Sequence, residues 1–343
     1  MRYLFILLFS NFLFVNSLAG NLIYVANVDD NSVSVIDSNT NSVIATVAVG
    51  QNPEFVATTP NGQFAYVSNF GDSTISIIST SSNTVVGIIN LPPNSSPNEI
   101  VFTPNGSFAY VANNNDIVSV IETAGNTLIK TISLSAGSEP NGITITPNGR
   151  YVYTANQGNN TVSVIETIGN TVLTSIPLTI GGSPYDLAIT PNGNNIYVAE
   201  LSIDQISVIE TAGNTLTSII SLPAGSGPAG LEVTPTGALV YVADSISSAV
   251  SIVETSGNIL IGNLSIGAST APQDVAITPD GRYVYVTEYL NNSVAIIETT
   301  SNTLIGRIGV GLNPVGISIA IIPQPPLPNP ILPPRHFNGK RKK

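Results

Sequence analysis

Apolar and polar residues alternate in short runs along most of the chain, and these runs return at regular intervals. In one unit the alternating runs are Asn141 to Ile145, Tyr151 to Ala155, Thr161 to Ile165 and Thr171 to Leu178. β-Branched and aromatic residues favour strands, whereas the Pro, Gly and Asn residues between the runs favour turns. Each unit therefore predicts four short antiparallel strands that form one small sheet.

A tetrapeptide led by tyrosine marks the same place in seven units, at steps of 42, 44, 43, 44, 44 and 44 residues. A period of this length with four strands is typical of a β-propeller blade. We therefore predict an all-β fold, a seven-bladed β-propeller of four-stranded antiparallel blades. The seven tetrapeptides begin at Tyr24, Tyr66, Tyr110, Tyr153, Tyr197, Tyr241 and Tyr285.

The first unit lacks its opening strand. A Thr-Pro-x-Gly turn precedes six of the tetrapeptides, but only the N-terminal leader precedes Tyr24. The missing strand is predicted at the other end of the sequence, where Pro314 to Ala320 matches Pro272 to Thr278 position for position. This C-terminal strand should complete the N-terminal blade, which closes the ring and removes its two open edges.

Three motifs recur in fixed order in most units: Thr-Pro-Asn-Gly, Tyr-Val-Ala-Asn and Val-Ser-Val-Ile-Glu-Thr, the last at Val162 to Thr167 in the fourth unit. Together they resemble the YVTN family of β-propeller repeats over about residues 20 to 322. The resemblance implies a propeller fold and an exported or cell-surface protein of bacteria or archaea. It implies no shared activity.

The first 19 residues have the pattern of a secretory signal peptide. Arg2 gives a basic start, Tyr3 to Val15 is almost wholly apolar, and small residues precede a cleavage site after Ala19. We therefore expect a secreted protein, in the periplasm, outside the cell or on its surface, with no transmembrane span in the mature chain. An uncleaved membrane anchor is the alternative. The chain contains no cysteine, so disulfides cannot stabilise it.

The last residues, 323–343, are predicted to form a disordered tail. A proline-rich stretch precedes Arg335 and the basic run Lys340 to Lys343, and such a composition cannot build a core. The tail could contact anionic envelope surfaces, while a solvated tail without a partner is the alternative.

The predicted propeller is strongly acidic. Residues 20–322 contain 21 acidic and four basic residues, which gives a net charge of −17. Phosphate groups would be repelled by this charge, so nucleic acid is a poor candidate for a partner.

Acidic residues also break the repeat. The tetrapeptide ends in Asn in the first four units but in an acid in the last three, and further acids lie on the predicted innermost strands, at channel-facing positions or one layer deeper. We expect these residues to gather near the channel mouth. Oxygen ligands suit Ca²⁺ or Mg²⁺, and solvent-exposed loop caps are the alternative. The predicted cation ligands are Asp186, Glu200, Glu232, Asp244, Asp274 and Glu288.

Catalytic residues are scarce in the sequence. His336, the only histidine, lies in the tail, and the chain has no cysteine and no tryptophan. Nucleophilic triads, haem ligation and histidine-based metal centres therefore lack their residues. A divalent-cation-dependent hydrolase similar to propeller lactonases is an alternative, because the six predicted cation ligands could hold its metal ion.

The leading hypothesis is a monomeric, non-enzymatic scaffold that binds a protein or glycan through its loop face. Rigid scaffolds with variable loops commonly bind in this way. The lactonase-like hydrolase and a structural component of the envelope are the alternatives. The predicted partner contacts are the apolar and aromatic residues Phe55, Phe70, Tyr185, Leu201, Ile203, Tyr289 and Leu290.

Overall fold

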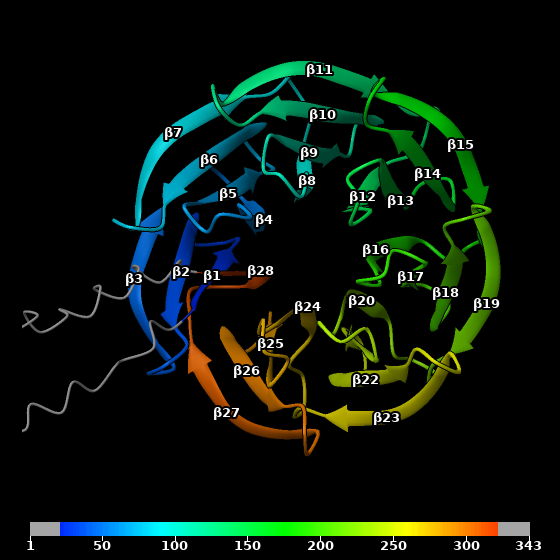
Figure 1. Ribbon diagram of the computed structural model, residues 1–343. Coiled ribbons are helices and arrows are strands. Elements are labelled where there is room, and N and C mark those ends of the chain that lie inside the picture. Colours follow the sequence, from blue (N-terminus) through cyan, green and yellow to red (C-terminus); the bar gives the residue numbers. More distant parts are fainter. Residues whose placement is uncertain (1–20, 322–343) are drawn as a thin grey trace, which may run out of the picture.

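The computed structural model describes residues 21–321, which form seven four-stranded antiparallel sheets (Figure 1). The sheets are arranged as blades around a central axis, so the predicted seven-bladed propeller is confirmed. The predicted signal peptide, residues 1–19, and the predicted tail, residues 323–343, lie outside the described residues.

The innermost strand of each blade begins at a proline. Its pairing with the next strand is irregular over the first two or three residues after this proline, as between Pro184 and Asp186. Such a bulge turns the following side chains. The inner strands are β4 (Pro53–Thr58), β8 (Pro97–Phe102), β12 (Pro140–Ile145), β16 (Pro184–Ile189), β20 (Pro228–Val233), β24 (Pro272–Ile277) and β28 (Pro314–Ala320).

The second strand of each blade carries the tyrosine tetrapeptide, and all seven of its tyrosines are at most 1% exposed. A buried tyrosine removes about 150–250 Å² from water, which stabilises the packing of neighbouring blades. These strands are β1 (Leu22–Asn27), β5 (Phe64–Asn69), β9 (Phe108–Asn113), β13 (Tyr151–Asn156), β17 (Asn195–Glu200), β21 (Leu239–Asp244) and β25 (Tyr283–Glu288).

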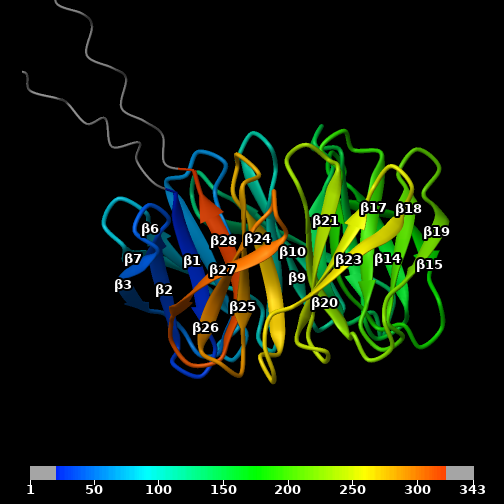
Figure 2. The same cartoon turned by 90° about the horizontal axis from the view of Figure 1, so that it is seen from below.

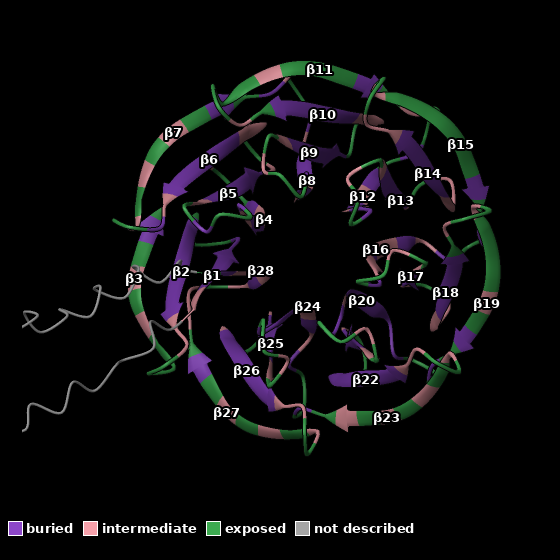
Figure 3. Cartoon of the chain, in the orientation of Figure 1, coloured by how far each residue is buried: buried purple, intermediate pink, exposed green. Residues whose placement is uncertain are grey.

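The third strand of each blade is buried over most of its length, because it lies between the second and the outer strand (Figure 3). Its apolar side chains pack against the adjacent blades. These strands are β2 (Ser32–Asp37), β6 (Thr74–Ser79), β10 (Ile117–Glu122), β14 (Thr161–Glu166), β18 (Gln205–Glu210), β22 (Ala249–Glu254) and β26 (Ser293–Glu298).

The outer strands form the exposed rim of the ring (Figure 3). Their alternate residues face solvent, as in Ser42–Ala48, where Ile44 is 50% exposed and Val47 is 6% exposed. These strands are β3 (Ser42–Ala48), β7 (Thr84–Asn90), β11 (Thr127–Ser133), β15 (Thr171–Pro177), β19 (Thr215–Ser221), β23 (Ile259–Ser265) and β27 (Thr303–Gly309).

The ring is closed by strands from opposite ends of the described chain. β28 pairs antiparallel with β1, with Leu22 opposite Ala320 and Asn27 opposite Pro314. The sheet order β28-β1-β2-β3 therefore confirms that the C-terminal strand completes the N-terminal blade.

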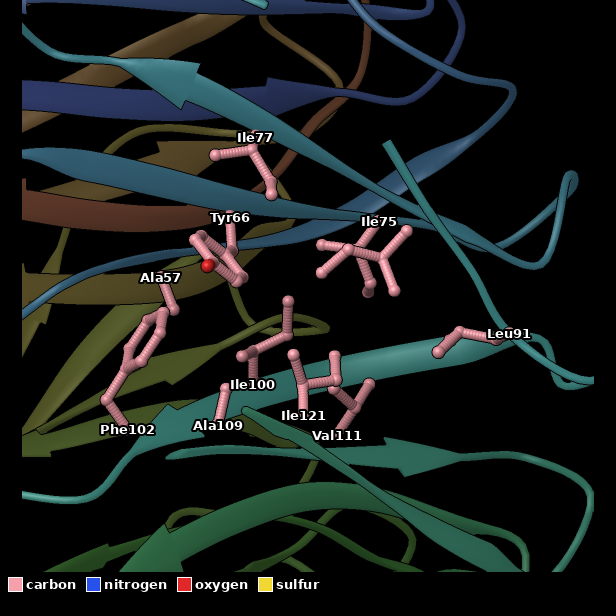
Figure 4. Packing of buried hydrophobic residues seen from close by; sticks show 11 residues of the cluster. Ala57, Tyr66, Ile75, Ile77, Leu91, Ile100, Phe102, Ala109, Val111 and Ile121 are labelled. Carbon is pink, nitrogen blue, oxygen red and sulfur yellow. The ribbon is translucent and has the colours of Figure 1, made fainter. Parts of the chain in front are cut away.

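The hydrophobic core is divided among the interfaces between blades. Figure 4 shows one interface, where Tyr66 and Ile75 of one blade face Ile100 and Val111 of the next. The ring of Tyr66 meets that of Phe102 edge-to-face, with centroids 5.0 Å apart. Each blade thus depends on its neighbours for burial.

The two faces of the ring differ in their connections (Figure 2). On one face, here named the loop face, lie the connections from second to third strands, such as residues 70–73, and from outer to inner strands, such as residues 178–183. On the other, the turn face, lie the Thr-Pro-x-Gly turns and the turns between third and outer strands. Across residues 21–321, the structure has no helix with the length and apolarity to cross a membrane.

Candidate functional site

A cavity of about 200 Å³ opens at the centre of the loop face. Its wall is made by the first residues of the inner strands and by loop residues of the second, third and fourth blades, including Phe70, Asn114 and Gln157. The inner strands surround the channel in Figure 1. The polar and aromatic side chains that the inner strands contribute are Glu54, Phe55, Asn98, Glu99, Asn141, Tyr185, Asp186, Gln273 and Asp274.

Three carboxylates in this wall connect neighbouring blades. Each lies on an inner strand and accepts a hydrogen bond from a backbone N–H on the inner strand of the next blade. Such bonds hold a buried carboxylate in place and reduce the cost of its burial. The pairs are Ile143 N to Glu99 Oε2 at 2.6 Å, Leu231 N to Asp186 Oδ2 at 2.9 Å, and Ile317 N to Asp274 Oδ2 at 3.0 Å.

Glycines alternate with the acids at this channel position. A Cβ at Gly142 would lie 2.7 Å from the Cα of Asp186, and one at Gly230 would lie 2.6 Å from the Cα of Asp274. Real Cβ atoms do not approach a backbone atom so closely, so only glycine allows these inner strands to meet. The acids are thereby brought together across the narrow centre of the ring.

Burial raises the pKa of each carboxyl group in the cluster. The pKa of Glu99 lies well above its ordinary value, mainly through burial and then through the negative charge of Asp186. Burial and the charge of Asp186 likewise raise the pKa of Asp274. Burial also raises the pKa of Asp186, although hydrogen bonds from the backbone N–H groups of Leu231 and Leu187, and then from the Glu99 side chain, act in the other direction. Glu99 and Asp186 therefore titrate as a coupled pair.

Two further acids, Glu54 and Glu232, line the channel near the cluster of Glu99, Asp186 and Asp274. Glu54 is half-buried in the cavity wall, and burial raises its pKa to about 6. Glu232 lies toward the turn face, in a second cavity of about 560 Å³. Its Oε2 accepts a hydrogen bond from the backbone N–H of Ile277, and burial raises its pKa to about 8.

The structure divides the six predicted cation ligands into two groups. Asp186, Asp274 and Glu232 line the channel cavities, but Glu200, Asp244 and Glu288 do not. These last three are fully buried inside their own blades. The expectation that all six meet at the channel mouth is therefore wrong, because the last residue of the second strand faces the third and outer strands of the same blade.

Inside the blades, each of these acids replaces an asparagine that bonds to hydroxyl groups. Asn69 donates to Thr74 Oγ1 and Ser76 Oγ, both at 2.9 Å. At the same place Asp244 accepts from Ser251 Oγ at 2.7 Å and from Asn263 Nδ2 at 2.9 Å. The position is thus a structural polar contact within the blade.

Charge compensation differs among the three. Glu288 forms an ion pair with Arg307 of the outer strand, with Nε to Oε2 at 2.9 Å, so this cation compensates the charge of the buried carboxylate. Glu200 accepts from Gln205 Nε2 at 3.1 Å and from the Ser207 hydroxyl, while its Oε2 has no partner among the described residues. Sequence reasoning missed Arg307, which lies in a different strand.

The described residues contain no group of three or more His, Cys, Asp or Glu side chains arranged to hold a metal ion. Glu99, Asp186 and Asp274 accept hydrogen bonds from three different backbone N–H groups. Ca²⁺ or Mg²⁺ binding therefore stays a prediction.

The predicted partner contacts also separate by position. Phe55, Phe70 and Tyr185 line the loop-face cavity. Leu201, Ile203, Tyr289 and Leu290 lie on loops of the fifth and seventh blades and are absent from its wall. Of these, Leu290 is 58% exposed.

The amides and Glu54 of the cavity wall were not predicted as site residues. Their signal in the sequence is positional, because they lie directly after the proline of an inner strand or directly after the tyrosine tetrapeptide. Glu99 shares the channel position of Asp186 and Asp274, yet only its contacts in the closed ring show that it belongs with them.

A family model described as lactonase, 7-bladed β-propeller, matches residues 18–216 and residues 187–311. No curated protein sequence matches the chain.

Solved structures similar to the chain show the same fold at low identity. A protein of unknown function from Desulfotomaculum acetoxidans is 20% identical, with a TM-score of 0.75, over 88% of this chain and 100% of that one. Hydrazine synthase of Kuenenia stuttgartiensis is 22% identical, with a TM-score of 0.69, over 77% of this chain and 88% of that one. Virginiamycin B lyase of Staphylococcus aureus is 18% identical, with a TM-score of 0.69, over 78% and 91%.

Proposed function

Since the chain belongs to the lactonase family of seven-bladed β-propellers, a fold that by itself fixes no activity, we propose that it is an exported, non-enzymatic protein that binds a glycan on its loop face. The observation that carries the proposal is the cavity at the centre of this face. The finer assignment to YVTN repeats, with its exported or cell-surface location, is part of the same proposal.

The chemistry of the cavity wall suits a hydroxyl-rich group. The side-chain amides of Asn98, Asn114 and Gln157 can both donate and accept hydrogen bonds, and the carboxylates can accept them from hydroxyl groups. Phe55 and Tyr185 supply apolar ring surface. The cavity, about 200 Å³, is smaller than the roughly 300–1,000 Å³ of drug-sized ligand sites, so it suits one sugar residue of a larger partner.

The surrounding loops would contact the rest of the partner. Leu201 and Ile203 are half-buried on the fifth-blade loop, and Leu290 is exposed on the seventh-blade loop. Apolar side chains on a rigid rim add contact area around a central polar anchor.

Binding of the purified protein to an array of immobilised glycans tests the proposal. Asn114→Trp places a large side chain at the cavity mouth, on an exposed loop residue, and should reduce binding at least tenfold. Ser247→Trp is the matched control, because Ser247 is exposed on the equivalent loop of the sixth blade, outside the cavity wall. Absence of glycan binding, or equal binding by both variants, would contradict the proposal, and capture of a protein partner instead would replace it.

One observation favours hydrolysis as a second candidate. Glu99 and Asp186 share a hydrogen bond in the cavity wall, and such a carboxyl pair can act as acid and base. Asp186 would take a proton from a water molecule while the oxygen of that water attacks the lactone carbonyl. Glu99 would donate a proton to the ring oxygen that leaves as the ring opens. The cation-dependent reaction predicted from sequence would instead place Ca²⁺ or Mg²⁺ beside these oxygens.

A panel of neutral lactones tests this second candidate. Among the described residues, no Lys or Arg lines the cavity, so an anionic lactone would lack a counter-charge. Turnover that Glu99→Gln and Asp186→Asn each reduce at least 100-fold would support hydrolysis. Turnover unchanged in both variants would overturn it.

A further inference from the structure

We propose that the sugar residue received in the loop-face cavity carries a free ammonium group, so that the ligand is an amino sugar. This inference rests on the proposed glycan binding and adds the charge of the bound group. The geometry behind it is a small cavity whose walls present carboxyl groups and aromatic rings together.

The ionisable groups of Asp and Glu that line the cavity are all acidic. They are the carboxyl groups of Glu54, Glu99, Asp186 and Asp274, and the described part of the chain places no cation beside them. Its four basic residues are elsewhere: Lys130 and Arg307 on outer strands, Arg150 and Arg282 in turn-face turns. A cationic ligand would supply the missing counter-charge where water is partly excluded, and there an ion pair is stronger than in bulk water.

Asn98 and Glu54 in the wall each have an acceptor oxygen that receives no hydrogen bond from residues 21–321. Asn98 is 9% exposed, and its Nδ2 donates to the backbone oxygen of Pro140 at 3.1 Å, whereas its Oδ1 accepts no hydrogen bond from the described residues. The carboxylate of Glu54 likewise has no hydrogen-bond partner within residues 21–321. An ammonium group has three donors and no acceptor, so it matches a site with spare acceptors.

The aromatic residues of the wall favour the same ligand. Phe55, Phe70 and Tyr185 line the same cavity as the acids. The negative face of an aromatic ring attracts organic cations, and its apolar surface packs against a sugar ring. A metal ion would gain little from these rings. It would also need three or more ligands arranged to hold it, and residues 21–321 contain no such group of His, Cys, Asp or Glu.

Isothermal titration calorimetry of the full chain at pH 7.5 and low salt tests the inference with glucosamine, glucose and N-acetylglucosamine. These sugars have the same ring, but only glucosamine carries an ammonium group. We expect glucosamine to bind at least tenfold more tightly than the other two, and its affinity to fall as salt is added.

Variants locate the charge recognition. Glu54→Gln should reduce glucosamine affinity at least fivefold, and it should fold normally because Glu54 makes no hydrogen bond within the described chain. Asp186→Asn tests the deeper group, whose backbone hydrogen bonds could affect folding. Glu122→Gln, which changes an exposed acid on the turn face, is the control and should change nothing.

Each outcome separates the two proposals. Equal binding of glucose and glucosamine would overturn the ammonium preference and leave glycan binding intact. Binding of propylammonium but of no sugar would support charge recognition and overturn the glycan. No binding of any of these probes, with glycans still bound on the array, would overturn the inference alone.

Discussion

The hydroxyl of Tyr285 donates a hydrogen bond to Asn41 Oδ1 at 3.0 Å, although 244 residues separate the two in sequence. Tyr285 belongs to the last blade and Asn41 to the turn between β2 and β3 of the first. The same contact joins the other neighbouring blades, as between Tyr153 and Asn214 at 2.7 Å. Asn41 has a φ of 49°, a conformation that asparagine tolerates better than most residues, so one side chain both shapes the turn and accepts the tyrosine hydroxyl.

Loss of one such hydroxyl should weaken the ring to the same extent wherever it occurs. We expect Tyr285→Phe and Tyr153→Phe each to lower the free energy of unfolding by about 0.5–1.5 kcal/mol, since each removes one hydrogen bond and leaves the packed ring in place. Urea denaturation measures the change. Tyr289→Phe, in a loop, is the control. If Tyr153→Phe lowered the free energy of unfolding but Tyr285→Phe did not, the first and last blades would not be joined in solution.

Removal of β28 should abolish cooperative unfolding. Deletion from Pro314 onward leaves β1 without its inner neighbour and opens the interface between the first and second blades, where Ser318 Oγ contacts Thr58 at 3.2 Å. Calorimetry should show a broad transition or none. A truncated protein that unfolds as sharply and at the same temperature as the full chain would contradict ring closure.

Stability should decrease as the pH rises from about 4 to 8. Burial raises the pKa of Asp244 to about 7 and that of Glu232 to about 8, both above their values in an unfolded chain. The folded state then binds protons more tightly than the unfolded state across this window, so alkaline conditions favour unfolding. The melting temperature at pH 5 should therefore exceed that at pH 8.

Asp244→Asn tests one of these contributors, because it restores the asparagine found in the first four blades. We expect the free energy of unfolding to increase by on the order of 1–3 kcal/mol at pH 8 and to change little at pH 4. Glu122→Gln, on the exposed turn face, should leave the pH profile unchanged. A loss of stability in Asp244→Asn at pH 8 would show that the aspartate is stabilising as a charged group.

Gly182 and Glu200 should be energetically coupled. A Cβ at Gly182 would overlap the Glu200 carboxylate, whereas the equivalent residues of the third and fourth blades are Ser95 and Ser138, which accompany an asparagine. Gly182→Ser alone should lower the free energy of unfolding by about 1–3 kcal/mol, because the new side chain would overlap the Glu200 carboxylate. Glu200→Asn with Gly182→Ser copies the other blades and should recover most of this loss. A double-mutant cycle with no coupling would contradict the contact.

The sequence alone was sufficient to predict the blades. Alternation with a period of two and the Pro, Gly and Asn turns are local properties, and their repetition determined both the number of blades and the closing role of Pro314 to Ala320. The buried tyrosines follow from the same repetition, because each blade needs a neighbour to cover its faces.

Only the tertiary structure decided where the acids lie. Glu200 and Asp186 both stand near the ends of strands in the sequence, yet one is enclosed in its blade and the other reaches the channel. The irregular pairing after each inner proline sets the direction of the channel residues, and the glycines at 142 and 230 set how closely the strands approach. The meeting of Glu99 with Asp186 depends on the closed ring itself, a distance that no local pattern of residues can contain.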